Sequence, residues 1–553
     1  MAGIAILVDQ RVLTRACQYY VRKRLELLQP FTYNVNILLW SRRQRIRLAQ
    51  ETEQKSGKSH NLTSYCMEQH TEYYRAMVAK DPRFDGVFFA GIKTTGIYCR
   101  PICRVKTPHE TSCVFFTSQA EAEAAGFRPC LRCRPELAPY ALQQNLAHAI
   151  WRKIAAGALN HQSLEEFADG IGLSSRQLRR VVQQEFGLSP IEIAQTQRLL
   201  FAKKLLQETH LPMTEVAYAA GFGSLRRFNA LFEQRYHLTP AAIRKQTAAD
   251  EDIRPERLLS LRLAYRPPLA WPELLRYSAG RALTGIEYVD FEKLCYSRTV
   301  RIGECEGWVQ LSHLPERQQL ALSVSSALQS VLMPLIERLR NQFDLEANPA
   351  MIAQHLQQDP RLAAQLLKTP GLRVPGAFDT FELAIRAILG QQVSVAGATT
   401  VAARLVARFG REVPVSSDLP SALQYHFPRA EDLAQASIDA IAGLGMPGKR
   451  AATVVAFAQF VADGGLDLPP HLPLEEVIAR LKALPGIGEW TAQYIAMRGL
   501  RYPNAFPAGD LGLQKAVSEN LEQRCSEKEL QAMSQAWSPW RSYAALLLWQ
   551  SLS

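Results

Sequence analysis

Four cysteines in the first third of the chain have the spacing of a metal site. Three residues separate Cys99 from Cys103, two separate Cys130 from Cys133, and 26 lie between the pairs. Two thiolate pairs at such spacings can complete a tetrahedral zinc site, and soft sulfur ligands select zinc over harder ions. The pattern predicts one Zn2+ on four thiolates. Cys113, which precedes VFF between the pairs, is expected to be a core residue.

The residues around both pairs resemble a DNA-repair family. The stretches FAGIKTTGIYCRPICRVKTP and EAEAAGFRPCLRCRPE are similar to the amino-terminal domain of the Ada adaptive-response proteins. That family removes a methyl group from a DNA methylphosphotriester. The resemblance implies that Cys99 accepts the methyl group in a suicide reaction and that Cys103, Cys130 and Cys133 are the other zinc ligands. The alternative is a purely structural zinc site.

The charge of such a site accounts for its choice of substrate. Zinc deprotonates its thiols, and four thiolates on a divalent ion carry a formal charge of minus two. That charge opposes an ordinary phosphodiester but not a neutral methylphosphotriester, and methylation of Cys99 would reduce it and favour DNA binding. We expect Lys106 and Arg128 to contact phosphates, with a solvated basic face as the alternative. Neighbouring basic residues that could steer the DNA backbone are Arg100, Arg104 and Arg132.

Two later segments have the pattern of a helix-turn-helix. SLEEFADGIGLSSRQLRRVVQQEFGLSP begins at Ser163 and MTEVAYAAGFGSLRRFNALFEQRYHLTP at Met213. Each combines an apolar-patterned helix, a glycine-containing turn and a second helix. The second segment, with AAGFGS and LTP, resembles the AraC-type signature, in which two such units joined by a helix enter successive major grooves. The resemblance places Phe222, Phe228 and Phe232 in the core and leaves Arg226, Arg227 and Asn229 able to reach bases or phosphates. In the first unit, the second helix carries Arg176, Arg179 and Arg180, and we expect Arg176 and Arg179 to contact DNA.

The stretch LPGIGEWTA, Leu484 to Ala492, is a helix-hairpin-helix signature. Gly486 and Gly488 let the hairpin backbone approach DNA closely, so that its N–H groups and the following helix start bind a phosphate, often with a monovalent cation. Alone, this signature indicates only a module that binds the DNA backbone. The earlier stretch GLGMPGKR is similar, and we interpret it as a turn.

An aspartate, Asp510, follows this hairpin in FPAGDLGLQKA. From about Leu261 the chain resembles AlkA, the broad-specificity 3-methyladenine DNA glycosylase, through YRPPLAW, FELAIRAILGQQVSV, LPGIGEWTAQYIAMRG and WSPWRSYAALLLW. The resemblance implies that the damaged base is flipped out and that Asp510 stabilises the oxocarbenium-like sugar and helps water to attack. The alternative for Asp510 is a helix cap. Related enzymes that also nick the strand carry a lysine just after the hairpin, where Trp490 stands here, so we predict a monofunctional glycosylase that leaves an abasic site.

Aromatic side chains suit the cationic base of this reaction, because their electron-rich faces attract it. Gln392 stands where the best-known AlkA enzyme has a leucine that wedges into the gap left by the flipped base, so we expect Gln392 to contact DNA. A glutamine can fill that gap and hydrogen-bond the orphan partner. Aromatic residues that match pocket positions of the family are Trp490, Tyr494 and Trp549, with Trp271 and Trp308 as further candidates; a core position is the alternative for each.

Bulk composition agrees with a DNA-binding protein of several domains. The 553 residues are 47% hydrophobic and 21% charged, with a formal net charge of +12. This length predicts three or four domains of roughly 100–200 residues, and the charge favours an anionic partner such as nucleic acid. No apolar run approaches the roughly 20 residues that a bilayer requires, and no secretory signal pattern is present. The ten cysteines are dispersed, so we expect a protein of the reducing cytoplasm without a membrane partner. The family resemblance implies a bacterial protein associated with the nucleoid.

Apolar spacing separates sheet-bearing from helical regions. LRLAYRPPLAW, AGRALTGIEYVD, KLCYSRTVRI, GWVQLSH and LALSVSS alternate like strands, and the chain from about Leu328 is helical. We expect a mainly α multidomain protein with α+β parts, including an α/β sheet domain like that of AlkA. The predicted boundaries are 1–66 for a basic extension of uncertain status, 67–139 for the zinc domain, 140–246 for the tandem helix-turn-helix, 247–257 for a linker, 258–370 for the sheet domain and the start of the helical region, and 371–553 for an all-α helix-hairpin-helix glycosylase domain.

The extension has eleven Lys and Arg residues against four Asp and Glu. Two interpretations remain open for it: a basic arm on DNA, or a segment upstream of a start at Met67. For the whole chain we favour a fusion that excises N-alkylated bases such as 3-methyladenine, accepts methyl groups from phosphotriesters and regulates transcription. Its expected partners are alkylated double-stranded DNA, promoter DNA and RNA polymerase. The alternative is a transcriptional regulator whose glycosylase region only scans DNA. A PCHR-like motif is absent, so we do not expect direct repair of alkylated guanine.

Overall fold

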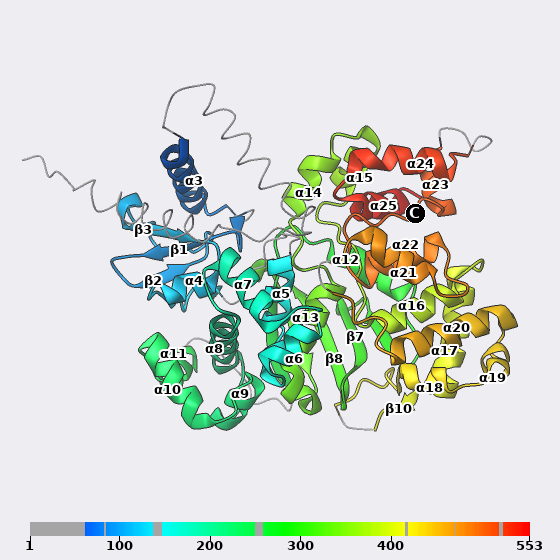
Figure 1. The fold of residues 1–553 in the computed structure, drawn as a ribbon, viewed down its shortest axis with the longest axis horizontal. Helices are drawn as coiled ribbons and strands as arrows, with labels where there is room; N and C mark the ends of the chain where they lie inside the picture. Colours follow the sequence, from blue (N-terminus) through cyan, green and yellow to red (C-terminus); the bar gives the residue numbers. More distant parts are fainter. Residues whose placement is uncertain are drawn as a thin grey trace, which may run out of the picture. The chain divides into compact units, whose positions relative to one another are not determined.

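The computed structural model describes residues 61–81, 84–135, 146–248, 258–414, 418–469, 472–518 and 524–552. The chain divides into two units, Met1–Gln69 and His70–Ser553. The expected extension lies outside the described residues as far as residue 60, and so do residues 249–257 of the expected linker. Figure 1 follows the described elements along the chain. Within the described ranges, no helix is both long and apolar enough to cross a membrane.

The zinc domain is built on a small sheet of short strands. The strand order is β3-β1-β2-β4, in which β1 is antiparallel to β2 and β3, and β4 is parallel to β2. Helix and sheet pack through aromatic rings, since Tyr73 stacks on Phe88 with ring centroids 4.3 Å apart. Cys113 is buried in β3, as expected of a core residue. The elements are α3 (Asn61–Val78), β1 (Phe89–Ile92), β2 (Ile97–Cys99), β3 (Cys113–Phe116), α4 (Gln119–Ala124) and β4 (Arg128–Pro129).

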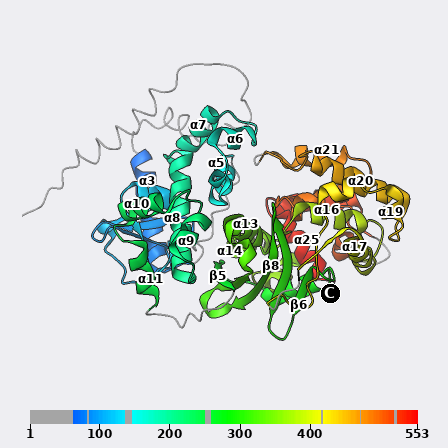
Figure 2. The ribbon, with the colours of Figure 1, turned by 90° about the horizontal axis from the view of Figure 1, so that it is seen from below.

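Two helix-turn-helix units follow, joined by one long helix. The linking helix α8 has 19 residues and is therefore about 28 Å long, which is close to the roughly 34 Å repeat of B-DNA. Figure 2 shows α8 running without interruption from α7 toward α9. The elements are α5 (Leu146–Ala155), α6 (Leu164–Asp169), α7 (Ser175–Phe186), α8 (Pro190–Glu208), α9 (Met213–Ala219), α10 (Leu225–Tyr236) and α11 (Pro240–Ala248).

Serine caps and an aromatic core fix these units. Ser174 accepts a hydrogen bond from the backbone N–H of Gln177 at the start of α7, and Ser224 does the same at α10. Such caps satisfy backbone donors that have no partner within the helix. The three phenylalanines of the second unit are buried as predicted, with centroid distances of 5.2 Å and 5.4 Å between successive rings: Phe222, Phe228 and Phe232.

The sheet domain contains an antiparallel five-stranded sheet in the order β5-β9-β8-β7-β6. Strand β9 alternates half-buried and buried residues, as a strand with one covered face should. The expectation of a strand through AGRALTG is wrong: this stretch comprises the end of a helix and the turns that follow it, and the strand is limited to β6. The elements are β5 (Leu259–Ala264), α12 (Trp271–Ala279), β6 (Glu287–Asp290), β7 (Cys295–Ile302), β8 (Cys305–Leu314) and β9 (Gln319–Val324).

The carboxy-terminal region is helical, as expected, apart from a small ribbon of β10 and β11 that the sequence did not indicate. The stretch GLGMPGKR makes the turn between α19 and α20. The elements are α13 (Leu332–Gln342), α14 (Pro349–Leu356), α15 (Pro360–Lys368), α16 (Thr380–Leu389), α17 (Val395–Phe409), β10 (Arg411–Glu412), β11 (Tyr425–His426), α18 (Ala430–Ala434), α19 (Ile438–Ala442), α20 (Gly448–Ala462), α21 (Leu474–Lys482), α22 (Glu489–Arg498), α23 (Leu511–Val517), α24 (Glu527–Met533) and α25 (Arg541–Gln550).

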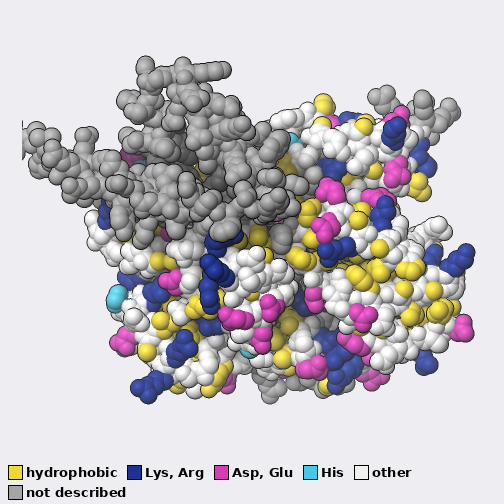
Figure 3. Space-filling model, viewed as in Figure 1, with side chains coloured by type: hydrophobic (Ala, Val, Ile, Leu, Met, Phe, Trp, Pro, Cys, Tyr) yellow, Lys and Arg dark blue, Asp and Glu magenta, His cyan; other side chains and the backbone are white. Residues whose placement is uncertain are grey.

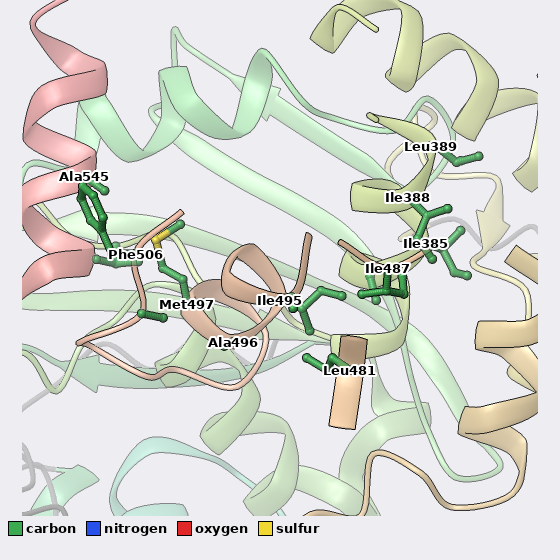
Figure 4. Packing of buried hydrophobic residues seen from close by; sticks show 14 of the residues in the cluster. Ile385, Ile388, Leu389, Leu481, Ile487, Ile495, Ala496, Met497, Phe506 and Ala545 are labelled. Carbon is green, nitrogen blue, oxygen red and sulfur yellow. The ribbon is translucent and has the colours of Figure 1, made fainter. Parts of the chain in front are cut away.

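The hairpin between α21 and α22 is anchored by its apolar residue. Ile487 is 5% exposed and belongs to the core of this region, together with Ile385 and Ile388 of α16. Figure 4 shows Ile487 beside these two side chains, with Ile495 of α22 nearby. The core thereby holds the hairpin and the start of α22 in a fixed position relative to α16.

Candidate functional site

The sheet of the zinc domain brings the two cysteine pairs together. Cys99 ends β2, and the backbone N–H of Cys130, just after β4, donates to the carbonyl of Tyr98 over 3.0 Å. Because β4 lies parallel to β2, Cys99 and Cys130 lie at the same end of the two strands. The sulfur atoms of Cys99, Cys103, Cys130 and Cys133 all lie within 4.8 Å of one another. The predicted four-cysteine cluster is confirmed.

The donor set fits zinc. Three of the four cysteines are buried, and Cys133 is half-buried. A hydrogen bond with Cys103 raises the pKa of the Cys99 thiol far above its ordinary value, and burial raises that of Cys133. Four crowded thiols therefore cannot all ionise without a cation among them. A divalent ion that prefers four sulfur ligands supplies that charge.

The basic residues near the cysteines have different surroundings. Arg100 is 7% exposed, its Nε donates to Asp85 Oδ1 over 2.8 Å, and its Nη1 donates to the carbonyl of Cys133 over 3.2 Å. The expectation that Arg100 could steer DNA is therefore wrong, because its guanidinium braces the cysteine loop from inside. Lys106 is exposed and Arg128 is half-buried, so both remain candidates for phosphate contact.

The second helix of each helix-turn-helix unit carries exposed arginines. Arg176 and Arg179 lie on α7, and Arg226 and Arg227 on α10, and all four are exposed. Arg179 also pairs with Glu165 at 3.4 Å, and a surface pair of this kind is easily exchanged for a phosphate. These positions therefore suit helices that enter a DNA groove.

Asp510 lies at the start of α23 and has three donors. Trp490 Nε1 donates to Asp510 Oδ2 and Trp549 Nε1 to Oδ1, each over 2.9 Å. The backbone N–H of Leu513 donates to Oδ1 over 3.0 Å, so Asp510 is the N-cap of this helix. The helix cap that was the alternative for Asp510 is thus real. The same carboxylate also lines a cavity, so its capping role does not exclude a chemical one.

The cavity beside Asp510 has a volume of about 670 Å³, and all three predicted pocket aromatics line it. Trp490 and Tyr494 stack one helical turn apart, with ring centroids at 5.1 Å and an angle of 13° between the rings. Trp549 closes another part of the wall. The further candidates Trp271 and Trp308 do not line this cavity and are buried in the sheet domain. Of the described residues that line it, none is a lysine.

The sequence did not indicate several polar residues that line the cavity, among them Tyr277, Arg281 and Arg498. Tyr277 and Arg281 belong to α12 and the turn after it, and Arg498 ends α22. The spacing of four between Tyr277 and Arg281 indicates one face of a helix, but the stretch that contains Arg281 had been interpreted as a strand. The sheet domain therefore contributes part of the wall of this cavity.

The two hairpin glycines have different roles. Gly486 has a φ of +81°, and a Cβ atom placed on it would lie 2.0 Å from Thr453 Oγ1. Only glycine fits this position without displacing its neighbour. Gly488, the N-cap of α22, has open space around it. Its position at a helix start suits the approach of a phosphate.

The loop between α16 and α17 contains the predicted wedge. Gln392 is exposed and has a φ of +57°, a left-handed conformation that costs a non-glycine residue about 1 kcal/mol. Val393 beside it is 43% exposed. The side chain of Gln391 donates to the carbonyl of Gly486 and to Thr491 Oγ1, both over 3.0 Å, and so ties this loop to the hairpin. Figure 3 shows hydrophobic side chains gathered over the region of α16, α17 and α20.

Four family profiles match the chain in succession. They also match the order of the domains seen in the structure. The profiles are the metal binding domain of Ada over residues 72–136, the helix-turn-helix domain over 167–246, the AlkA N-terminal domain over 260–379, and the HhH-GPD superfamily base excision DNA repair protein over 385–542.

Curated relatives show the same combination. The "probable bifunctional transcriptional activator/DNA repair enzyme AlkA" of Mycobacterium tuberculosis (strain ATCC 25618 / H37Rv) is 39% identical over 485 residues, which cover 87% of this chain and 96% of that protein. DNA-3-methyladenine glycosylase 2 of Escherichia coli is 33% identical over 52% of this chain and 95% of its own length. The bifunctional transcriptional activator/DNA repair enzyme Ada of Escherichia coli is 37% identical over 21% of this chain and 33% of its own.

A four-cysteine zinc domain, tandem helix-turn-helix units and a helix-hairpin-helix domain with a carboxylate at its cavity define a class of protein, a DNA-repair enzyme fused to a transcription regulator. Within this class, the chain belongs to the family of the bifunctional transcriptional activator/DNA repair enzyme AlkA.

Proposed function

We propose that this protein hydrolyses the N-glycosyl bond of N-alkylated bases such as 3-methyladenine, with Asp510 as the catalytic carboxylate. The observation that carries the proposal is the pair of hydrogen bonds from Trp490 and Trp549, one to each carboxylate oxygen, at the wall of an aromatic cavity. Neutral indole donors fix the carboxylate without cancelling its charge. A fixed anion beside the sugar stabilises positive charge as it develops there.

The reaction then needs no covalent enzyme intermediate. An N-alkylated purine already carries positive charge, so it leaves as a neutral base when the bond to C1′ breaks. Water adds to the cationic sugar beside Asp510 and loses a proton to the carboxylate or to solvent, which gives an abasic sugar. A lysine that could attack the sugar instead is missing from the described lining of the cavity. We therefore infer a monofunctional glycosylase.

Alkylated duplex DNA tests this proposal directly. Incubation with the purified protein should release free 3-methyladenine, detected by chromatography, and should leave strands that break only after treatment with alkali. Release of no base would leave the alternative, a glycosylase region that only scans DNA. Strand breaks without alkali would contradict the monofunctional assignment.

The zinc domain supports a second reaction, methyl transfer to Cys99. Among the four sulfurs, that of Cys133 accepts a backbone hydrogen bond, from the N–H of Arg100 over 3.4 Å. No backbone donor to Cys99 is found among the described residues. A thiolate without such donors keeps more charge on sulfur and is the better nucleophile.

Methyl transfer to Cys99 forms one bond and breaks one ester bond of the phosphotriester. The sulfur–carbon bond forms as the carbon–oxygen bond of the methylphosphotriester breaks, and the leaving group is the ordinary phosphodiester anion. Zinc bound to the four cysteines keeps their sulfurs ionised at neutral pH. DNA that carries a methylphosphotriester should transfer its methyl to Cys99, as mapped by mass spectrometry. A methyl found on another residue, or on none, would leave the purely structural zinc site.

The remaining domains support binding to promoter DNA. The exposed arginines of α7 and α10 and the length of α8 suit two units in successive major grooves. We infer that the methylated protein activates transcription in the bacterial cytoplasm together with RNA polymerase. Transcription from a bound promoter in a purified system should rise after incubation with methylphosphotriester DNA. An equal rise for the Cys99→Ser variant would contradict this link.

A further inference from the structure

The base cavity has a polar end that the glycosylase reaction does not account for. Tyr494 stacks on the Trp490 ring, and the hydroxyls of Tyr277 and Tyr494 lie 3.5 Å apart. The guanidinium of Arg281 lies 3.9 Å from the centroid of the Tyr277 ring. That of Arg498 lies 4.9 Å from the Tyr277 centroid and 5.3 Å from the Tyr494 centroid. Two phenols and two cations thus share one end of a pocket for cationic bases.

Neither arginine has a carboxylate partner among the described residues. Arg498 donates to the carbonyls of Pro375 and Gly376 over 2.6 Å and 3.3 Å, and its Nη1 donates to the Tyr494 hydroxyl. Arg281 has its cation–π contact with Tyr277. Two guanidinium groups in a half-buried pocket repel a cationic base unless a negative charge lies between them and it. The group in position to carry that charge is the phenol of Tyr494.

We propose that Tyr494 distinguishes a cationic base from a neutral one by changing its own protonation state. As a phenolate, Tyr494 offsets the two arginines and pairs with the positive charge of an N-alkylpurine that has entered the pocket. As a phenol, it leaves the arginines dominant, which disfavours a cation and favours a neutral base that carries a hydrogen-bond acceptor. The proposal rests on the proposed glycosylase function and gives that pocket its substrate class.

The electrostatics of the pair agree with these roles. Burial opposes ionisation of Tyr494, but Arg498 and Arg281 outweigh it and lower the pKa of Tyr494 to about 8. Burial raises the pKa of Tyr277 to about 12, so Tyr277 stays protonated and donates to the phenolate. The other charged groups that line the cavity are Glu273, Arg276, Arg373, Arg386 and Asp510.

Those other groups do not replace Tyr494 as the titrating charge. Arg276 pairs with Glu273 at 2.9 Å, Arg386 pairs with Glu287 at 2.9 Å, and Arg373 donates to backbone carbonyls. Asp510 is held at the N–H edge of the Trp490 ring and by the indole of Trp549. Tyr494 is half-ionised near pH 8, so its negative charge grows as pH rises through 8 and disappears below about 7.

Absorbance of tyrosinate tests the ionisation without any reaction. In the full-length protein we expect one tyrosine to titrate with a midpoint near pH 8, about two units below the ordinary value for tyrosine, and this step should be missing from Tyr494→Phe. The matched control is Tyr288→Phe, because Tyr288 is 43% exposed on β6 and lies outside the cavity. The proposal is overturned if no tyrosine titrates below pH 9, or if Tyr494→Phe keeps the early step.

Base release tests the selectivity. The single-turnover rate for cationic 3-methyladenine, divided by that for neutral hypoxanthine, should rise about 30-fold from pH 7 to pH 8.5 at subsaturating enzyme, following the ratio of phenolate to phenol for a group with a pKa near 8. In Tyr494→Phe this ratio should be flat, and in Tyr288→Phe it should match the wild type. An equal pH dependence in Tyr494→Phe contradicts the role of Tyr494. Release of neither base by the wild type contradicts the glycosylase function instead, and the absorbance titration then decides on the ionisation alone.

Discussion

The cysteine cluster and the aspartate cavity prepare an anion for DNA in opposite ways. At the cysteines, four thiols lie within 4.8 Å of one another, and only a bound cation lets them ionise together. At Asp510, the carboxylate is held by two neutral indole N–H groups and one backbone N–H. In the proposed reactions, the first anion attacks and is consumed, whereas the second stabilises a cation and persists through each turnover.

This difference teaches what each site depends on. The thiolate site is assembled by its metal, so its fold and its reactivity are lost together. The carboxylate site is assembled by the protein core, so its parts can be removed one at a time. Substitutions at the cysteines should therefore act as all-or-none changes, and those around Asp510 should act in graded steps.

Removal of zinc should have the largest effect. Chelation, or the Cys130→Ala substitution, should abolish methyl transfer and unfold the zinc domain, because structural zinc sites of this size supply much of the folding free energy. Base release from alkylated DNA should stay within about twofold of the wild type. Circular dichroism, methyl transfer and base release on the same samples check this. Loss of base release after chelation would show that the two sites are not independent.

The Asp510→Asn substitution should slow base release by roughly 100-fold to 1,000-fold, as removal of a transition-state charge partner does. Asparagine is also a good N-cap, so α23 and the melting temperature should change little. Binding to DNA that already contains an abasic site should be retained. Single-turnover kinetics give the rate of base release, and a binding titration gives the affinity for abasic DNA. An unchanged rate would show that Asp510 is not the catalytic carboxylate.

Loss of one indole donor should have an intermediate effect. Trp549→Phe keeps an aromatic wall but removes the hydrogen bond to Asp510 Oδ1, and a hydrogen bond to a charged group contributes about 1.5–3 kcal/mol. Base release should therefore fall by roughly 10-fold to 100-fold. The control is Trp540→Phe, because Trp540 packs on the same core but does not line the cavity. Equal effects of the two substitutions would indicate a packing role only.

Alanine substitutions at the two hairpin glycines should have different effects on thermal stability. Gly486→Ala forces a Cβ against Thr453 in a left-handed conformation, so the melting temperature of the glycosylase region should fall by several degrees, equivalent to about 1–2 kcal/mol. Gly488→Ala has open space and ordinary backbone angles, and should leave the melting temperature nearly unchanged. Thermal unfolding of both variants checks this contrast. A larger fall for Gly488→Ala would contradict the assigned conformations.

The smallest effect should come from the exposed arginines of the helix-turn-helix units. If Arg226 contacts a phosphate, Arg226→Ala should reduce the slope of log affinity against log salt by about one, with little change in sequence preference. The matched change on the other unit is Arg176→Ala. Promoter titrations at several salt concentrations provide the slopes. A strong change in base preference would instead place the side chain at a base edge.

Local patterns carried much of what could be predicted. The cysteine site was visible because two short spacings contain all four ligands, and Asp510 was visible because it follows a hairpin signature at a short distance. The donors to Asp510 were not visible, since the direction of the Trp490 and Trp549 N–H groups depends on how α22 and α25 pack. Arg100 was misjudged because its partner Asp85 lies in another loop.

The polar end of the cavity could not be predicted from the sequence for a related reason. Tyr277 and Tyr494 are 217 positions apart and meet only because α12 of the sheet domain faces α22. The sequence around Arg281 was interpreted as a strand because AGRALTG follows the alternation of the neighbouring segments. Pro272 in the first turn of α12 favoured the helix, since proline suits that position.

Asp510 also has a consequence for how this lineage can change. The residue caps α23 through Oδ1 and faces the cavity with the same carboxylate. Most substitutions would therefore remove the N-cap of α23 as well as the carboxylate that the proposed reaction uses. Asparagine is the exception, because it caps a helix as well as aspartate does. Since aspartate and asparagine codons differ by one nucleotide, the proposed mechanism implies that a single point mutation separates a repair enzyme from a folded DNA-binding protein that releases the damaged base far more slowly.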